Sequence, residues 1–113
     1  ILVIVIVLLA AVFWYANRST PDPALDAFAK CLAAKGVTMY GADWCPHCQN
    51  EKRAFGSSFQ FVPYVECPDE PEKCLALEIQ GYPTWIFDDG RRLEGEQGIE
   101  KLSEASGCPL YTK

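Results

Sequence analysis

The sequence predicts an α/β domain in which helices flank a four-stranded mixed sheet, preceded by an apolar transmembrane helix. Three observations lead to this prediction. The chain opens with an uninterrupted apolar run, short β-branched or aromatic segments then alternate with helical patterns, and the last two predicted strands are joined by the hairpin turn Asp-Asp-Gly at 88–90. A β-α-β unit gives parallel strands and a hairpin adds antiparallel ones, so the sheet should be mixed.

The apolar run at 1–16 is predicted to be a membrane anchor. At 1.5 Å per residue it spans about 24 Å, slightly less than the hydrocarbon core of a bilayer. A cleaved signal peptide is the alternative, but a cleavage after Ala16 would place the bulky Trp14 where a small residue is expected. Residues 17–22 form a polar linker, and residues 23–113 form the predicted domain.

The helices and strands of the domain are predicted from local patterns. Asp22 is a predicted N-cap, followed by Pro23 at the first helical position. Phe28 and Leu32 lie four residues apart, which is typical of one buried helix face. Pro63 indicates an edge strand, because proline cannot donate to the ladder. The predicted helices are 23–35, 46–55, 71–80 and 98–106, and the predicted strands are 37–40, 61–66, 84–87 and 91–94.

Two cysteines separated by two residues form the candidate catalytic site. Cys45 follows a predicted strand and opens a predicted helix, whose N-terminus favours a thiolate, so Cys45 is the predicted nucleophile. Cys48 lies one turn further and is the predicted resolving partner in dithiol–disulfide exchange. His47 is the only histidine in the chain. If its ring points at Cys45, it stabilises the thiolate and makes the disulfide more oxidising.

Two motifs make the chain resemble the thioredoxin superfamily over residues 24–108. They are Trp-Cys-Pro-His-Cys at 44–48, after a strand, and Gly-Tyr-Pro-Thr-Trp at 81–85, before a hairpin. The inner Cys-Pro-His-Cys sequence is similar to that of DsbA-type oxidases. With residues 39–43 and 64–67, the pattern resembles the thioredoxin-like domains that are fused to, or work beside, vitamin K epoxide reductase homologues.

The resemblance implies further site residues and a partner. Pro83 would be the cis-proline that faces the active-site disulfide, leaving the neighbouring backbone free to pair with a substrate strand. No cofactor is implied beyond the Cys45–Cys48 disulfide itself, and a vitamin K epoxide reductase-like membrane protein would be the electron acceptor. The implied substrate-binding residues are Trp44, Tyr82 and Thr84.

One position departs from the family pattern. Thioredoxins carry a buried aspartate six residues before the first cysteine, and this chain has Met39 there. That aspartate is associated with accepting the proton of the second cysteine, so the proton acceptor for Cys48 is not identified. Glu51 lies one turn after Cys48 and is a weak candidate, because most glutamates at such positions are merely solvated.

The other four cysteines are read as structural, with alternatives left open. Cys67 and Cys74 are predicted to form a disulfide that closes a short loop and stabilises the fold by about 2–3 kcal/mol. A redox relay and a metal site are the alternatives for this pair. Cys31 and Cys108 lie on or after helices that run to the same edge of the sheet, and their pairing stays open. The spacing lacks the second close pair of a zinc ribbon, so no metal is predicted.

Composition limits the remaining functions. A net charge of −5 gives no basic footprint for nucleic acid. Six cysteines in 113 residues favour an oxidising compartment. The prediction is therefore a single-pass membrane-anchored, extracytoplasmic thiol–disulfide oxidoreductase that promotes disulfide formation in cysteine-containing exported proteins. The alternatives are a reductase or isomerase of the same fold, a non-catalytic binding module, and a metal-transfer protein.

Overall fold

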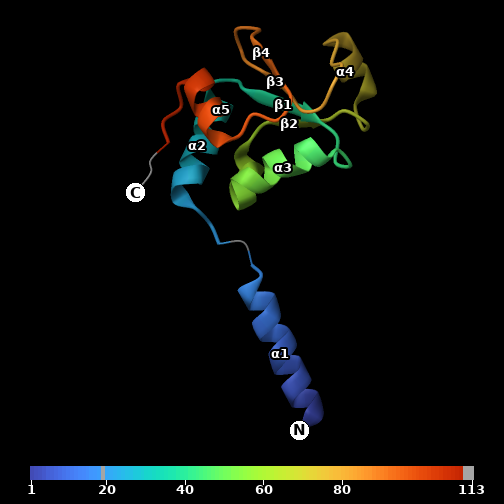
Figure 1. Cartoon of the computed structure of the whole chain (residues 1–113), viewed down its shortest axis with the longest axis vertical. Helices are drawn as coiled ribbons and strands as arrows, with labels where there is room; N and C mark the ends of the chain where they lie inside the picture. The colour runs from blue at the N-terminus through green and yellow to red at the C-terminus, as the bar shows by residue number, and fades with distance from the viewer. Residues whose placement is uncertain (19, 111–113) are drawn as a thin grey trace.

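The computed structural model describes residues 1–18 and 20–110. Residue 19 of the predicted linker and residues 111–113 of the predicted domain lie outside the described residues. Figure 1 shows a folded domain with one helix, α1, projecting away from it. The elements in chain order are α1 (Leu2–Ala16), α2 (Pro23–Ala34), β1 (Thr38–Gly41), α3 (Pro46–Phe55), the 3₁₀ helix η1 (Gly56–Phe61), β2 (Tyr64–Glu66), α4 (Pro71–Ala76), β3 (Thr84–Ile86), β4 (Arg92–Glu94) and α5 (Ile99–Ser106).

The sheet is mixed, as predicted. Its strand order is β2-β1-β3-β4. β1 and β2 run parallel with Met39 opposite Tyr64, whereas β1 and β3 run antiparallel with Met39 opposite Trp85. β3 and β4 form the predicted antiparallel hairpin. β2 lies at an edge of the sheet, which confirms the interpretation of Pro63.

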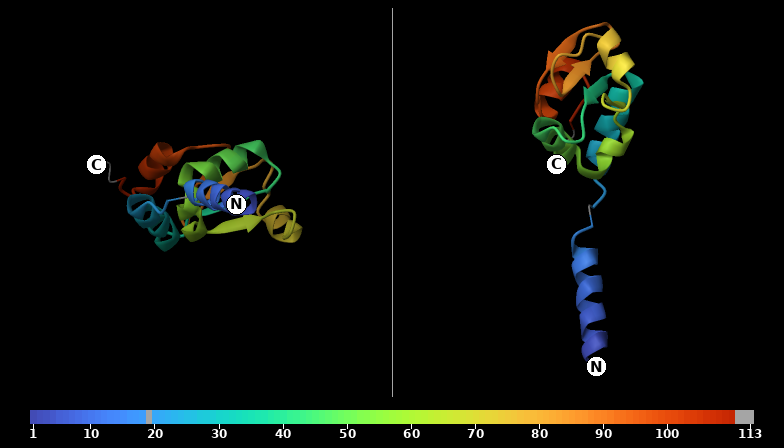
Figure 2. Two further views of the ribbon diagram at one scale, coloured as in Figure 1. Left: turned by 90° about the horizontal axis from the view of Figure 1, so that it is seen from below. Right: turned by 90° about the vertical axis from the view of Figure 1, so that its right-hand side faces the viewer.

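Alternate residues of β1 serve two apolar clusters, one on each face of the sheet. Met39 belongs to the larger cluster, which also takes residues from α2, α3 and α5. Tyr40 belongs to the smaller one, which includes Cys74 of α4. Figure 2 shows, from two further sides, the helices packed around the strands. This alternation is the period of two expected for a strand covered on both sides.

The predicted boundaries differ from the structure by more than one residue at two elements. The strand expected at 61–66 starts only at Tyr64, because the preceding residues form η1. Phe59 of η1 packs edge-on against the rings of Phe55 and Tyr64, so this part of the apolar pattern belongs to helical packing. The helix expected at 71–80 ends at Ala76, and Glu78 then takes a positive φ of 56°.

Helix α1 is apolar and leaves all its side chains exposed. In the described part of the chain, no helix combines the length and the apolar character needed to cross a membrane. The predicted transmembrane helix at 1–16 is therefore not supported. α1 has 15 residues, which rise about 22 Å along its axis.

Two disulfides fasten the periphery of the domain. Cys67 and Cys74 are bonded and close the loop between β2 and α4, as predicted. Cys31 and Cys108 are also bonded, with Cα atoms 5.9 Å apart, which answers the question that the sequence left open. This second bridge joins α2 to the segment that follows α5. The predicted N-cap is confirmed as well, because Asp22 accepts hydrogen bonds from two backbone N–H groups of the first turn of α2.

Candidate active site

Cys45 stands where β1 has ended and α3 begins. It is the N-cap residue of α3, and Pro46 occupies the first helical turn. Its Sγ lies 3.6 Å from the carbonyl oxygen of Tyr82, to which it donates a hydrogen bond. Cys45 is 8% exposed and Cys48 is fully buried, and both are free thiols. The two predicted sulfurs therefore lie together at the start of one helix, with only Cys45 open to a partner.

Cys48 is held as a protonated thiol by its surroundings. Burial raises its pKa to about 11, and the hydrogen bond and charge of Cys45 add to the shift. A hydrogen bond with the backbone of Ala42 and the charge of Lys52 act in the opposite direction. Because the thiolate is the nucleophile, the Cys48 thiol can react only when its proton has a destination.

Gly41 makes the close approach of Cys48 possible. A Cβ atom at this position would lie 2.7 Å from Sγ of Cys48 and 3.3 Å from Cε2 of Tyr64. Any side chain here would push the resolving sulfur out of place. The local sequence pattern does not indicate this requirement, because the contact partners of Gly41 lie on other elements of the fold.

The predicted proline motif lies opposite the sulfurs. The Tyr82–Pro83 peptide bond is cis. The carbonyl oxygen of Pro83 accepts a hydrogen bond of 2.7 Å from the N–H of Gly95, which fixes the segment to the end of β4. The side chain of Thr84 is buried, and its hydroxyl donates to the carbonyl oxygen of Gly81. Thr84 thus shapes the loop from inside, and the expected substrate contact through its side chain is not supported.

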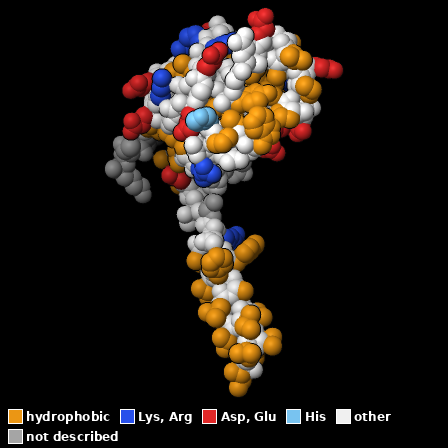
Figure 3. Space-filling view, turned by 45° about the vertical axis from the view of Figure 1, so that its right-hand side comes forward, with side chains coloured by type: hydrophobic (Ala, Val, Ile, Leu, Met, Phe, Trp, Pro, Cys, Tyr) orange, Lys and Arg blue, Asp and Glu red, His pale blue; other side chains and the backbone are white. Residues whose placement is uncertain are grey.

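An aromatic pair borders Cys45 at the surface. The rings of Trp44 and Tyr82 meet edge to face with centroids 6.0 Å apart. Trp44 is 65% exposed, which is unusual for so large an apolar side chain. Figure 3 shows hydrophobic side chains gathered beside the single histidine on this face of the domain. The two aromatic residues predicted to contact substrate therefore lie where a substrate thiol would approach Cys45.

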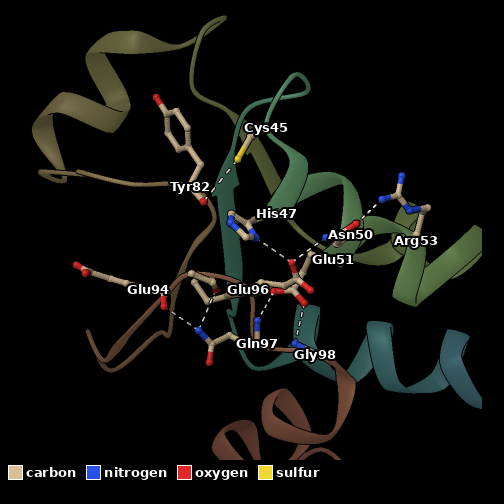
Figure 4. Close-up of polar contacts among 12 residues, drawn as sticks. Cys45, His47, Asn50, Glu51, Arg53, Tyr82, Glu94, Glu96, Gln97 and Gly98 are labelled. Atoms are coloured by element: carbon tan, nitrogen blue, oxygen red, sulfur yellow. Dashed lines mark hydrogen bonds and ion pairs between the residues drawn. The ribbon is translucent and has the colours of Figure 1, made fainter.

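His47 points into a polar cluster on the surface. Its Nδ1 lies 3.1 Å from Oε1 of Glu96, and Asn50 donates a hydrogen bond to the same oxygen. The hydrogen bond from Asn50, and after it the contact with His47, hold the pKa of the Glu96 carboxyl below its usual value. Figure 4 shows the ring turned towards Glu96. Among the described residues, no hydrogen bond joins the ring to Cys45, so the predicted stabilisation of the thiolate would act through charge across space.

Glu51 is buried, whereas the sequence pattern predicted a solvated side chain. Its carboxylate accepts hydrogen bonds from the indole N–H of Trp85 and from the backbone N–H groups of Gln97 and Gly98. Figure 4 shows it between α3 and the segment that follows β4. Both carboxylate oxygens are committed to these donors. Glu51 is therefore an internal anchor, and this role was missed because its partners lie far away in the sequence.

Comparisons with known proteins agree with this geometry. A scan against protein-family models finds no match. The chain is 40% identical over 101 residues to the thiol-disulfide oxidoreductase LTO1 of Arabidopsis thaliana, an alignment that covers 81% of the chain and 27% of that protein. It is 28% identical over 106 residues to the thioredoxin domain-containing protein 5 homolog of Drosophila melanogaster, covering 79% of the chain and 25% of that protein. The chain thus spans about a quarter of the length of these curated relatives.

A solved structure establishes the fold. The NTD_N/C domain of alkylhydroperoxide reductase AhpF from Enterococcus faecalis superposes with a TM-score of 0.50 at 18% sequence identity, covering 79% of this chain and 45% of that chain. At this identity the match shows the fold alone. The domain has a thioredoxin-like α/β fold with a four-stranded mixed sheet. The names of the two sequence relatives support the predicted class, a protein thiol–disulfide oxidoreductase.

Proposed function

We propose that this chain is a thiol–disulfide oxidoreductase that exchanges disulfides through Cys45 and Cys48. The observation that carries the proposal is the pairing of a slightly exposed thiol at a helix N-terminus with a fully buried, protonated thiol one turn later. In the oxidising direction, a substrate thiolate attacks Sγ of Cys45 in the Cys45–Cys48 disulfide, and Cys48 leaves as a thiolate that takes up a proton. A second substrate thiolate then attacks the substrate sulfur, which forms the substrate disulfide and releases Cys45.

The proposed direction is oxidation of substrate thiols. His47 lies two residues after Cys45, and Pro46-His47 is the inner pair of the motif. A positive imidazolium near the thiolate stabilises the reduced form and therefore raises the reduction potential of the disulfide. The carboxylate of Glu96 lies 3.1 Å from Nδ1 and fixes the orientation of the ring beside the motif. We therefore expect a reduction potential nearer to that of the oxidising members of the fold than to that of thioredoxin.

A redox titration tests the direction. The chain is equilibrated with mixtures of reduced and oxidised glutathione, and the Cys45–Cys48 state is read by thiol labelling and mass spectrometry. We expect a potential well above the roughly −270 mV of thioredoxin, closer to the about −120 mV of strongly oxidising members. A potential as low as that of thioredoxin would instead favour a disulfide reductase or isomerase of the same fold.

We further propose that the domain works outside the cytoplasm, attached to a membrane through α1. The support is the apolar character and full exposure of α1, together with two disulfides in addition to the Cys45–Cys48 pair. The proposed partners are cysteine-containing exported proteins and a vitamin K epoxide reductase-like membrane protein that accepts the electrons. Carbonate extraction and protease protection of the natural protein test the attachment and the side. Complete release by carbonate, or protection of the domain on the cytoplasmic side, would contradict it.

A matched pair of variants tests the exchange itself. Cys45→Ser should abolish oxidation of a reduced, unfolded substrate protein, because the attacked sulfur is gone. The double variant Cys31→Ala/Cys108→Ala, which removes a disulfide outside the site, should keep the activity under conditions where it is folded. Activity that survives Cys45→Ser would favour a non-catalytic binding module.

A further inference from the structure

The resolving step requires an acceptor for the proton of Cys48. The buried thiol keeps its proton at neutral pH, since burial raises its pKa to about 11. Met39 has no group that can take this proton, and it faces the core. Glu51 is the nearest acid along α3, but both its oxygens already accept hydrogen bonds from Trp85 and from the backbone at residues 97 and 98. The acceptor must therefore lie on another element.

The ring of Tyr64 and the sulfur of Cys48 border the same space beside Gly41. Both are neighbours of the vacant side-chain position of Gly41, where a Cβ would be 2.7 Å from Sγ of Cys48 and 3.3 Å from Cε2 of Tyr64. The parallel pairing of β1 and β2 produces this arrangement, because it sets Gly41 opposite Glu66 and Met39 opposite Tyr64. The missing side chain of Gly41 thus leaves a space that the buried thiol of Cys48 and the phenol ring of Tyr64 both border.

The hydroxyl of Tyr64 is part of a chain of hydrogen bonds through Glu66. It donates a hydrogen bond to Oε1 of Glu66, while Oε2 of the same carboxylate accepts the N–H of Asp43 at 2.9 Å. Burial, and then the contact with Glu66, raise the pKa of Tyr64. The hydroxyl therefore stays protonated, and it can give its proton to Glu66 only if it accepts another proton at the same time. Tyr64 and Glu66 are both half-buried, which gives the carboxylate an exit for the proton to solvent.

We propose that Tyr64 and Glu66 are the proton relay of the resolving cysteine. The inference rests on the proposed function of the Cys45–Cys48 pair. As Sγ of Cys48 attacks Sγ of Cys45 in the mixed disulfide, the S–H proton passes to the Tyr64 hydroxyl, which gives its own proton to Glu66. The Cys45–Cys48 bond forms, the bond from Cys45 to the substrate sulfur breaks, and the substrate leaves as a thiolate. In the oxidising direction the same path returns a proton to Cys48.

The charges around Cys48 favour this route. Cys45 and Lys52 face it from α3, Tyr64 and Glu66 lie beside it on β2, and Asp43 approaches from the loop after β1. The ammonium group of Lys52 lies 4.1 Å from the centroid of the Tyr64 ring and favours the thiolate. A proton on Glu66 removes a neighbouring negative charge at the moment when the Cys48 thiolate forms. Charge separation in the half-buried site is thereby kept small.

The relay is tested by separating the two thiol steps in a single turnover. The reduced full chain, with its two outer disulfides intact, is mixed in mild detergent with an aromatic disulfide that releases a coloured thiol. The first release reports attack by Cys45, and the second, unimolecular release reports attack by Cys48. Tyr64→Phe and Glu66→Gln are compared with wild type across the pH range. Glu72→Gln is the matched control, since Glu72 is an exposed acid on α4.

The predicted result is a selective effect. Both relay variants should slow the second release about tenfold or more at neutral pH, the lower part of the range for general acid–base catalysis, and leave the first unchanged. Their rates should rise with pH and converge with wild type at alkaline pH, where Cys48 ionises without help. Unchanged second phases in both variants, or an equal loss in Glu72→Gln, would overturn the relay. A wild-type chain that lacks both phases would instead refute the proposed function.

Discussion

The environment of one residue, Cys48, decides the order of events at the site. A thiol with a raised pKa is a poor nucleophile. In the proposed exchange, the buried sulfur of Cys48 therefore reacts after Cys45 has formed the mixed disulfide. The same burial has a consequence for stability. Because the pKa in the folded state lies above the unfolded value of 9.0, the folded state holds this proton more tightly. The contribution of this bound proton to stability is complete below pH 9.0 and is lost as the pH rises through about 11.

This shift can be measured directly. In the reduced chain labelled with ¹³C at cysteine Cβ, the chemical shift of Cys48 should titrate near pH 11. The physical reason is burial, which disfavours the thiolate. The chain in denaturant is the control, where the same atom should titrate near 9.0. A folded-state value at or below that of the control would show that Cys48 is not the protonated partner.

Gly41 is the second residue on which the site depends. Gly41→Ala places a methyl group 2.7 Å from Sγ of Cys48, so the sulfur or the strand must move. We expect a loss of about 1–3 kcal/mol in the free energy of unfolding, as for other overpacked sites. Urea unfolding of the reduced chain measures it. Gly81→Ala is the control, because a Cβ at that position meets no atom within 4 Å. Equal stability of the two variants would show that the fold tolerates a side chain between Gly41 and Sγ of Cys48.

At the scale of elements, the carboxylate of Glu51 joins α3 to the segment between β4 and α5. It receives the side-chain N–H of Trp85 and two backbone N–H groups. Glu51→Gln weakens these charge-assisted bonds and turns an amide NH₂ towards donors. We expect a loss of about 2–3 kcal/mol in the free energy of unfolding, measured with urea. Glu104→Gln, an exposed change on α5, should be nearly neutral. A similar small effect in both would refute the anchor role.

The elements also show what sequence patterns can and cannot predict. The β1–α3 junction, the edge position of β2 and the β3–β4 hairpin were predicted because each depends on residues close together in the chain. The cysteine pair was found for the same reason. The partners of Glu51 and His47 were not, since they lie 34 to 49 residues away and only the folded sheet brings them together. The strand expected at 61–66 was shortened because Phe59 packs on α3.

At the scale of the whole molecule, the Cys31–Cys108 bridge fastens the two ends of the domain. Its sequence separation is 77 residues, whereas Cys67–Cys74 spans only 7. On the chain-entropy model, the long loop contributes about 4–5 kcal/mol and the short one about 2–3 kcal/mol. Cys31→Ala/Cys108→Ala should therefore lower the midpoint of urea unfolding more than Cys67→Ala/Cys74→Ala. The reverse order would show that α2 and the C-terminal segment hold together without the bridge.

The central claim for the whole molecule is that substrate sulfur bonds to Cys45, and trapping tests it most directly. In Cys48→Ala the mixed disulfide cannot be resolved, so the chain is incubated with a disulfide-containing protein, quenched in acid and mapped by mass spectrometry without reduction. We expect a covalent complex whose only bond to this chain is at Cys45, and no complex from Cys45→Ser/Cys48→Ala. A complex joined through any other cysteine, or none at all, would contradict it.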